Sequence, residues 1–267
     1  MIYKDILYDK RDGIATITIN RPRVLNAFRA ETVEEMLAAM RDAEDDRDIG
    51  VIVLAGAGDR AFCSGGDNSA RASGSASAEG YGGRGLVGLP IEELHNAIRD
   101  SRKPVIAKVQ GYAIGGGNVL ATVCDLTIAS DKAVFGQVGP RVGSVDPGWG
   151  TAYLSRLVGE KRAREIWFLC RRYSAAEAFQ MGLVNKVVPA EQLDAEVEAW
   201  CQEILTLSPT AIAIAKRSFN ADSENIRGIG ALGLEALALY YDTEEAQEGT
   251  TAFLEKRRPD FRAKRSH

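Results

Sequence analysis

Residues Lys103–Ser130 read KPVIAKVQGYAIGGGNVLATVCDLTIAS, and this stretch decides the fold. Its β-branched apolar run Val105–Val109 predicts a buried strand. Gly111 ends that strand, and three glycines, Gly115–Gly117, come before an apolar run, Val119–Val123, on which a helix can be built. The stretch therefore predicts strand, tight turn, helix and second strand, the alternation typical of an α/β protein.

The glycine run also has a chemical consequence. Without side chains, the N–H groups of Gly115–Gly117 are bare, and a ligand can come close to the backbone. These groups would lie at a helix N-terminus, where the dipole favours negative charge. A second glycine-rich turn follows the predicted strand Val51–Ala55 and reads Ala61-Phe62-Cys63-Ser64-Gly65-Gly66-Asp67. Two such turns can aim two N–H donors at one carbonyl oxygen, as in an oxyanion hole.

The pair of turns, with its flanking strands and spacing, resembles the crotonase (enoyl-CoA hydratase/isomerase) superfamily from Asn20-Arg21-Pro22 to the C-terminal helices. The resemblance implies an α/β fold with a ClpP-like ββα spiral core over residues 1–200. It implies a C-terminal helical region for trimerisation over residues 201–267. It also implies acyl-CoA substrates whose enolates are held by two backbone N–H groups, those of Gly66 and Gly116. The expected partners are the acyl-CoA and further copies of the chain, as a trimer or a hexamer built as a dimer of trimers.

Composition restricts the functional classes. The chain has 267 residues, 45% of them hydrophobic, which is enough for a large core, and no apolar stretch approaches the length of a membrane span. Its net charge of −4 argues against a nucleic-acid surface. The four cysteines form no CxxC pair, so we expect no metal, and no cofactor beyond the CoA of the substrate. Met1–Lys10 does not resemble a secretory signal, and we expect a cytoplasmic protein.

The resemblance also assigns a CoA site. The segment Arg23–Phe28 is similar to the family segment along the CoA adenine and phosphates, and Arg23 is suited to pair with a phosphate oxygen, unless it is simply an exposed loop arginine. The segment Phe253–Pro259 resembles the one that reaches a neighbour's CoA. The implied CoA-binding residues are Arg23, Val24, Ala61, Ser64, Asp67 and Lys256.

Two further segments contain candidate polar residues. Residues 69–88, rich in Gly, Ser and Ala, predict a mobile loop that covers the acyl end of the ligand, with Tyr81 and Arg84 as residues that could reach it. The helix that opens after Leu89-Pro90 contains His95, which could act as a base or proton shuttle or make a polar contact on the helix face.

The glycine-rich segment after Val134 contains Asp146 among Val145, Pro147 and Trp149. An apolar setting raises the pKa of a carboxyl group and makes it a better base near neutral pH. The alternative is an aspartate that caps the helix after Gly148. Near the C-terminus, residues 228–248 predict one long apolar helix that carries Tyr240 and Tyr241 and packs on another subunit.

The acid–base groups distinguish branches of the family. Hydratases of the family carry one glutamate just after the GGG turn and another two residues after the FGQ motif. Here these positions hold Val119 and Gly139, which disfavours hydration and simple isomerisation. The chain resembles instead the branch of 2-ketocyclohexanecarboxyl-CoA hydrolase and 1,4-dihydroxy-2-naphthoyl-CoA synthase. Asn118, Val138 and Leu25 replace the His, Thr and Arg of the synthase pattern and favour the hydrolase.

The resemblance therefore implies hydrolytic opening of a cyclic β-ketoacyl-CoA to pimeloyl-CoA, a retro-Dieckmann cleavage in alicyclic or aromatic acid degradation. Asp146 is the expected base, Gly66 and Gly116 hold the enolate, and Ser144 binds the ketone or the water. Tyr241 is the candidate proton donor, or else an interface tyrosine. Gln137 and Trp167 are interpreted as supporting residues. The alternatives are the synthase's intramolecular Claisen condensation and, further off, a non-catalytic scaffold of the same fold.

Overall fold

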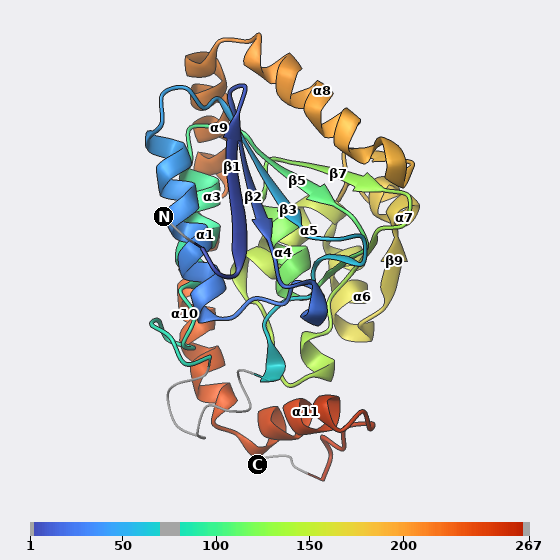
Figure 1. Cartoon of the computed structure of the whole chain (residues 1–267). Coiled ribbons are helices and arrows are strands. Elements are labelled where there is room, and N and C mark those ends of the chain that lie inside the picture. The colour runs from blue at the N-terminus through green and yellow to red at the C-terminus, as the bar shows by residue number, and fades with distance from the viewer. Residues whose placement is uncertain (1–2, 70–80, 264–267) are drawn as a thin grey trace.

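The computed structural model describes residues 3–69 and 81–263, which fold around two β-sheets (Figure 1). The strands are β1 (Ile6–Arg11), β2 (Ile14–Ile19), β3 (Val51–Gly56), β4 (Ala61–Cys63), β5 (Val105–Val109), β6 (Tyr112–Ile114), β7 (Leu126–Ser130), β8 (Val134–Gly136), β9 (Arg172–Ser174) and β10 (Lys186–Val188). The α-helices are α1 (Ala30–Asp45), α3 (Ile91–Asp100), α4 (Gly116–Val123), α5 (Ala152–Val158), α6 (Glu160–Leu169), α7 (Ala175–Gln180), α8 (Leu193–Leu205), α9 (Pro209–Asp222), α10 (Asn225–Tyr241) and α11 (Glu244–Leu254). Four 3₁₀ turns complete them: η1 (Pro22–Val24), η2 (Gly139–Arg141), η3 (Gly148–Gly150) and η4 (Ala190–Gln192).

The six-stranded sheet has the order β1-β2-β3-β5-β7-β10, and only β1 runs antiparallel to its neighbour. Its central strands are buried on both faces, which is why β3 is a continuous apolar run. Along β3, Ile52 and Leu54 join the larger core with α1 and α3, while Val51 and Val53 join a smaller core under α8. The structure thus confirms the strands predicted at Val51–Ala55 and Val105–Val109.

The four-stranded sheet, ordered β4-β6-β8-β9, positions the glycine-rich turns. Strands β4 and β6 lie side by side and parallel, so the turns that follow their carboxyl ends lie next to each other. Helix α4 begins at Gly116, directly after β6, as the predicted strand–turn–helix unit requires. Gly117 must be glycine, because a Cβ there would lie 1.9 Å from the carbonyl oxygen of Cys63.

The C-terminal helices differ from the prediction in one respect. The expected single helix over residues 228–248 is wrong, because the chain ends α10 at Tyr241 and starts α11 at Glu244. The hydroxyl of Thr243 accepts the N–H of Ala246 at 3.2 Å and so caps the new helix. In Figure 1, α11 turns away from α10 at the lower end of the molecule. The break leaves Tyr241 at the very end of α10.

The C-terminal region exposes large apolar side chains. Phe219 on α9 is 76% exposed, and Leu232 and Leu239 on α10 are 71% and 74% exposed. Such exposure on neighbouring helices is typical of a surface that packs on another subunit. The predicted boundary between residues 200 and 201 falls inside α8, whose Cys201 is buried in the smaller core.

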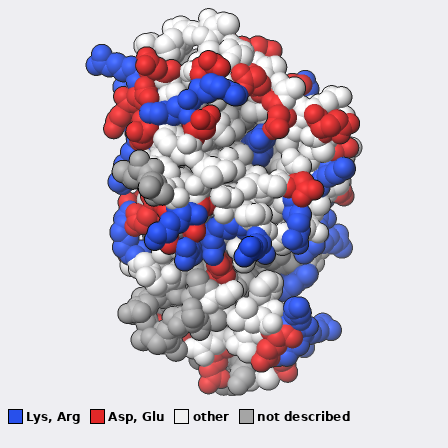
Figure 2. Space-filling model, viewed as in Figure 1, with Lys and Arg blue, Asp and Glu red and all other residues white. Residues whose placement is uncertain are grey.

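Within residues 3–69 and 81–263, none of the helices is long and apolar enough to cross a membrane. The surface is charged with both signs: in Figure 2, acidic and basic side chains intermingle over the upper part of the face shown, and Lys and Arg form a band across its middle.

Candidate active site

The two glycine-rich turns meet as the sequence predicts. Gly65 and Gly115 have φ angles of +92° and +59°, a region that a side chain disfavours, and each precedes a candidate donor, Gly66 or Gly116. The turns approach so closely that a Cβ on Gly65 would lie 3.0 Å from the nitrogen of Gly116. The positive φ angles of Gly65 and Gly115 therefore direct the amides of the residues that follow them, Gly66 and Gly116, toward one small region.

Both candidate donors are left without an acceptor. The N–H of Phe28 donates to the carbonyl of Gly65 at 2.9 Å, and the carbonyl of Phe28 accepts from the N–H of Asp67 at 2.8 Å. Phe28 thus bonds the residues on either side of Gly66 and leaves the N–H of Gly66 unused. Gly116 is the first residue of α4 and has no earlier helical turn to bond to. Among the described residues, neither amide donates a hydrogen bond. Two unpaired N–H groups at the end of a helix can hold a developing oxyanion.

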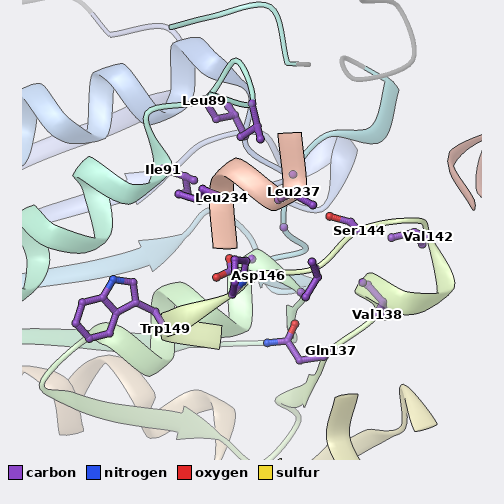
Figure 3. Close-up of a pocket in the computed structure, with 18 of the residues that line it drawn as sticks. Leu89, Ile91, Gln137, Val138, Val142, Ser144, Asp146, Trp149, Leu234 and Leu237 are labelled. Atoms are coloured by element: carbon purple, nitrogen blue, oxygen red, sulfur yellow. The ribbon is translucent and has the colours of Figure 1, made fainter. Parts of the chain in front are cut away.

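A pocket with a volume of about 100 Å³ opens at these amides. Its walls come from the two turns, α3, the loop that follows β8, and α10, and they are largely apolar. Figure 3 shows Leu89 and Ile91 above the pocket, Leu234 and Leu237 beside it, and Val138 and Val142 at its edge. An apolar pocket of this size that carries a few polar groups suits a compact acyl group.

Asp146 lies in the wall of this pocket (Figure 3). The residue is half-buried, but its carboxyl group is surrounded by protein, and this burial raises the carboxyl pKa to about 7. The N–H of Gly150 donates to it and offsets part of the rise. The indole of Trp167 donates to the carbonyl of the same Gly150, so Trp167 helps to position the residue whose N–H bonds the carboxylate. The capping alternative is wrong, because Pro147 and Thr151, not Asp146, are the N-cap residues of η3 and α5. Asp146 instead presents a carboxyl group that can accept a proton near neutral pH.

Ser144 and Tyr241 also line the pocket, and their hydroxyl oxygens lie 2.7 Å apart. One belongs to the loop two residues before Asp146 and the other to the end of α10. The structure therefore brings together all five residues predicted to be catalytic: Asp146, Tyr241, Gly66, Gly116 and Ser144.

The positions that carry glutamates in hydratases of the family are closed to that chemistry here. Val119 is fully buried, and its Cγ2 and the Cβ of Asp146 would each lie 3.0 Å from a Cβ on Gly150. At Gly139, a Cβ would lie 2.5 Å from the carbonyl oxygen of Ser144 and 2.9 Å from the ring of Trp167. Asp146 is therefore packed beside one of these positions, and the other has no room for a side chain.

Sequence reasoning underestimated two polar residues. Gln137, interpreted as a supporting residue, itself lines the pocket, and neither atom of its buried amide has a hydrogen-bond partner among the described residues. His95 is 3% exposed and lines the pocket instead of making a polar contact on an open helix face. The signal was present, because His95 lies four residues after Ile91 and three before Ile98, on the apolar face of α3. Burial lowers the pKa of His95 to about 3, so the imidazole is neutral and is not a base at neutral pH.

The predicted loop over residues 69–88 falls partly outside the described residues. Tyr81 lines the pocket, and its hydroxyl lies so near Gly66 that a Cβ there would be 2.3 Å away. Arg84 instead pairs with Glu34 and Glu93 on the surface and does not line the pocket.

Most of the predicted CoA-binding residues cluster beside the oxyanion hole. The exposed Arg23 and the 40% exposed Val24 lie on η1, and the Ser64 N–H donates to the Leu25 carbonyl at 3.1 Å. Ala61 is buried, and its carbonyl accepts from the amide of Asn26 at 2.7 Å. These contacts hold η1 next to the turn that ends in Gly66.

Two of the predicted residues differ from this group. The Asp67 carboxylate pairs with the Arg21 guanidinium at 3.0 Å, so its charge is neutralised inside the fold. Lys256 lies apart from the pocket, in a groove between α6 and α11 with Arg141, Arg257 and Arg258. No group of three or more potential metal ligands exists among the described residues, and all four cysteines are buried and free.

Comparison with known proteins agrees with this geometry. Residues 9–264 match the family model described as enoyl-CoA hydratase/isomerase. The chain therefore belongs to the enoyl-CoA hydratase/isomerase family, the crotonase superfamily, whose members act on CoA thioesters. The α/β crotonase fold with a C-terminal helical region is the one predicted.

Several solved structures are similar to the chain over nearly its whole length. It is similar to an enoyl-CoA hydratase from Mycobacterium avium subsp. paratuberculosis K-10, with 30% identity, a TM-score of 0.85 and coverage of 97% of this chain and 99% of that one. An enoyl-CoA hydratase/isomerase from Xanthobacter autotrophicus Py2 is 31% identical, with a TM-score of 0.82 and coverage of 95% and 93%. A carnitinyl-CoA hydratase from Mycobacterium avium is 28% identical, with a TM-score of 0.82 and coverage of 98% and 100%.

Proposed function

We propose that this protein opens the ring of a cyclic β-ketoacyl-CoA by hydrolysis, with 2-ketocyclohexanecarboxyl-CoA and water giving pimeloyl-CoA. The observation that carries the proposal is Asp146, a carboxyl group with a pKa raised to about 7 in the pocket that holds the Gly66 and Gly116 amides. A base, an oxyanion hole and a small apolar pocket are what this reaction needs.

In the first step, the thioester carbonyl accepts hydrogen bonds from the Gly66 and Gly116 amides. Asp146 takes a proton from a water molecule, and the resulting hydroxide adds to the ring ketone. The paired hydroxyls of Ser144 and Tyr241 are polar groups in the pocket wall that can orient the water and the ketone oxygen.

In the second step, the tetrahedral adduct collapses to a carboxylic acid. The bond between the former ketone carbon and the α-carbon breaks, and its electron pair moves into the thioester as an enolate. The two amides stabilise this enolate, and losing one such donor typically costs about 2.7–4 kcal/mol of barrier. A proton then goes to the α-carbon, from Tyr241 in the pair with Ser144 or from protonated Asp146.

The similar structures are named as hydratases, yet their reaction is not the one we propose here. Hydratases of the family use two glutamates, and the corresponding positions in this chain are the buried Val119 and the crowded Gly139. Asp146 lies beside the first of these positions and has a carboxyl pKa raised to about 7, which supports a reaction that needs one base.

The alternative within the same branch is the intramolecular Claisen condensation of 1,4-dihydroxy-2-naphthoyl-CoA synthase. Val138 lines the pocket where that pattern has a Thr, and it offers no hydroxyl to hold an external base. Asn118, which replaces a His of that pattern, is fully buried and is not among the pocket-lining residues. Both observations favour the hydrolase.

The test is mass spectrometry of the purified protein incubated with 2-oxocyclohexanecarboxyl-CoA. We expect a product heavier by one water that behaves as pimeloyl-CoA. Crotonyl-CoA and o-succinylbenzoyl-CoA serve as comparison substrates. Hydration of the first, or loss of water from the second, with the cyclic ester left intact, would contradict the proposal. The cytoplasmic location, the trimer or hexamer and the six CoA-binding residues belong to the same proposal, and size-exclusion chromatography with light scattering tests the assembly.

A further inference from the structure

A buried arginine lies behind the turn that holds Asp146. Arg99, in the last turn of α3, is only 4% exposed. The Cζ atom of its guanidinium lies 5.4 Å from the ring centre of Trp149 and 4.6 Å from that of Tyr153, where a cation is attracted to an aromatic ring. The guanidinium also donates to the hydroxyl of Tyr153 at 2.7 Å and to that of Ser223 at 3.0 Å. Arg99 therefore ties α3 to η3, to α5 and to the end of α9.

The guanidinium and the two rings form one cluster. Among the residues that the structure describes, the guanidinium bonds only the two hydroxyls, and its Nε bonds none. A buried cation without a carboxylate partner is costly, so the contacts with the rings offset part of that cost. The rings of Trp149 and Tyr153 also meet edge to face, with centroids 5.3 Å apart. In Figure 3 the Trp149 ring is directed away from Asp146, so the cluster holds it on the outer side of the pocket wall.

The backbone of Trp149 carries the peptide that bonds Asp146. The donating N–H of Gly150 belongs to the peptide between Trp149 and Gly150. Trp167 bonds the carbonyl of Gly150, which belongs to the next peptide, and so it does not fix this N–H directly. The start of the turn is held separately, because Gly148 packs against the backbone of α10. The side chain of Trp149 is therefore the anchor that adjoins the donating N–H in the chain.

We propose that Arg99 is a positioning residue for the base, because through the ring of Trp149 it holds η3 so that the Gly150 N–H stays on the carboxylate of Asp146. The inference rests on the proposed function for the role of Asp146, but it concerns a residue outside the pocket lining. A hydrogen bond to the charged form of an acid favours that form. Loss of the bond would therefore keep Asp146 protonated to higher pH.

The test follows the ionisation of Asp146 without substrate. Infrared difference spectra between pH 5 and pH 10 record the C=O stretch of protonated carboxyl groups, and the spectrum of Asp146→Asn identifies the band of Asp146. Among the described residues, the other titratable groups that line the pocket are Glu92, His95, Tyr81 and Tyr241. Of these only Glu92 has a carboxyl group, and the comparison with Asp146→Asn separates its band.

We expect Arg99→Met to raise the pKa of Asp146 by about one pH unit, the effect of losing one hydrogen bond to a charged group. The substitution keeps an unbranched side chain of similar length, so the main change is the loss of the cation from the rings. The rising limb of kcat/KM against pH should move upward by the same amount.

Three further variants make the result specific. Arg99→Lys keeps a cation beside the rings and should show less than half of the shift. Tyr153→Phe keeps both rings but removes a hydroxyl that orients the guanidinium, so it should give a smaller rise and serves if Arg99→Met does not fold. Lys216→Met removes another buried cation, which bonds the carbonyl of Ile98 next to Arg99. It should lower stability in urea and leave the pKa of Asp146 unchanged.

An unchanged pKa in both Arg99→Met and Tyr153→Phe would overturn the proposal, because η3 would then be held without Arg99. A lower pKa would also overturn it, since Arg99 would then only keep water away from Asp146. The two proposals fail separately. If the pKa rises but 2-oxocyclohexanecarboxyl-CoA is not cleaved, only the ring-opening reaction is wrong. If the ring is opened and the pKa does not rise, only the role of Arg99 is wrong.

Discussion

The hydroxyl oxygens of Ser144 and Tyr241 lie 2.7 Å apart although 97 residues separate them in the chain. The contact joins the loop of Asp146 to the last turn of α10. It exists because α10 ends at Tyr241, so that the chain turns away just beyond the pocket. In the proposed reaction, this pair delivers the proton of the Tyr241 hydroxyl to the α-carbon, and protonated Asp146 restores it.

Removing the Tyr241 hydroxyl should slow catalysis. We expect Tyr241→Phe to lower kcat by roughly 10²-fold, within the range for loss of a general acid, and Ser144→Ala by roughly tenfold through loss of the orienting bond. Because the two act as a unit, the double variant should be no slower than Tyr241→Phe within about twofold. Steady-state kinetics of all three provides the check, and Tyr240→Phe, outside the pocket lining, is the matched control. Strictly additive losses would show that the hydroxyls act independently.

Asp146→Asn should abolish the base and leave ligand binding intact. We expect kcat to fall by about 10²–10⁴-fold with little change in the affinity for an unreactive acyl-CoA. Asp131→Asn, at an exposed position after β7, controls for loss of a carboxylate elsewhere. A wild-type rate in Asp146→Asn would remove this residue from the mechanism.

The rate should depend on pH through the same group. The carboxyl pKa of Asp146 is raised to about 7, and only the ionised form accepts a proton. The value of kcat/KM should therefore increase about tenfold per pH unit below pH 7 and level off above it. A profile that stays flat from pH 5.5 to 8.5 would be incompatible with Asp146 as the base.

The raised pKa also has a cost in stability. Between its ordinary value of 3.8 and about 7, the folded carboxyl keeps a proton that the unfolded chain releases. Folded protein then binds more protons than unfolded protein, so stability falls as pH rises through this window and stays lower above it. We expect Asp146→Asn to exceed wild type in free energy of unfolding at pH 8 by at least about 1 kcal/mol and to match it near pH 4. Urea titrations at the two pH values measure this, and an equal gain at both would exclude the ionisation as its cause.

The oxyanion hole should not tolerate a methyl group at Gly116. A Cβ there would lie 2.6 Å from the ring of Phe28, so Gly116→Ala must shift the donor amide. We expect kcat to fall by roughly 10²–10³-fold, as for loss of one oxyanion donor. Gly228→Ala on α10 is the control, since a Cβ there meets no atom within 4 Å and should stabilise the helix by about 0.5–1 kcal/mol. Normal activity in Gly116→Ala would mean that this amide does not hold the enolate.

The sequence alone predicted the features that depend on residues close together in the chain. Glycine-rich turns after buried strands indicate two N–H donors, which the family resemblance assigns to Gly66 and Gly116, and an aspartate among apolar residues indicates Asp146. It did not predict the break after Tyr241, because a capping threonine within an apolar pattern is a weak signal beside helical periodicity. It also missed the importance of His95, since a helix face becomes a pocket wall only when tertiary packing places other elements opposite it. Whether Asp67 binds a ligand or Arg21 likewise depends on a partner 46 residues away.

The reactivity of the four buried cysteines can report where the protein structure opens locally. Cys63 lies behind the oxyanion hole, where its sulfur accepts the N–H of Gly65, and Cys201 lies in the smaller core under α8. Burial raises the pKa of both thiols to about 12, so neither reacts with a thiol reagent until its surroundings open. The labelling rate at each cysteine therefore measures the local opening of its own part of the structure. A ligand held by the Gly66 and Gly116 amides will slow the labelling of Cys63 and leave the labelling rate of Cys201 unchanged.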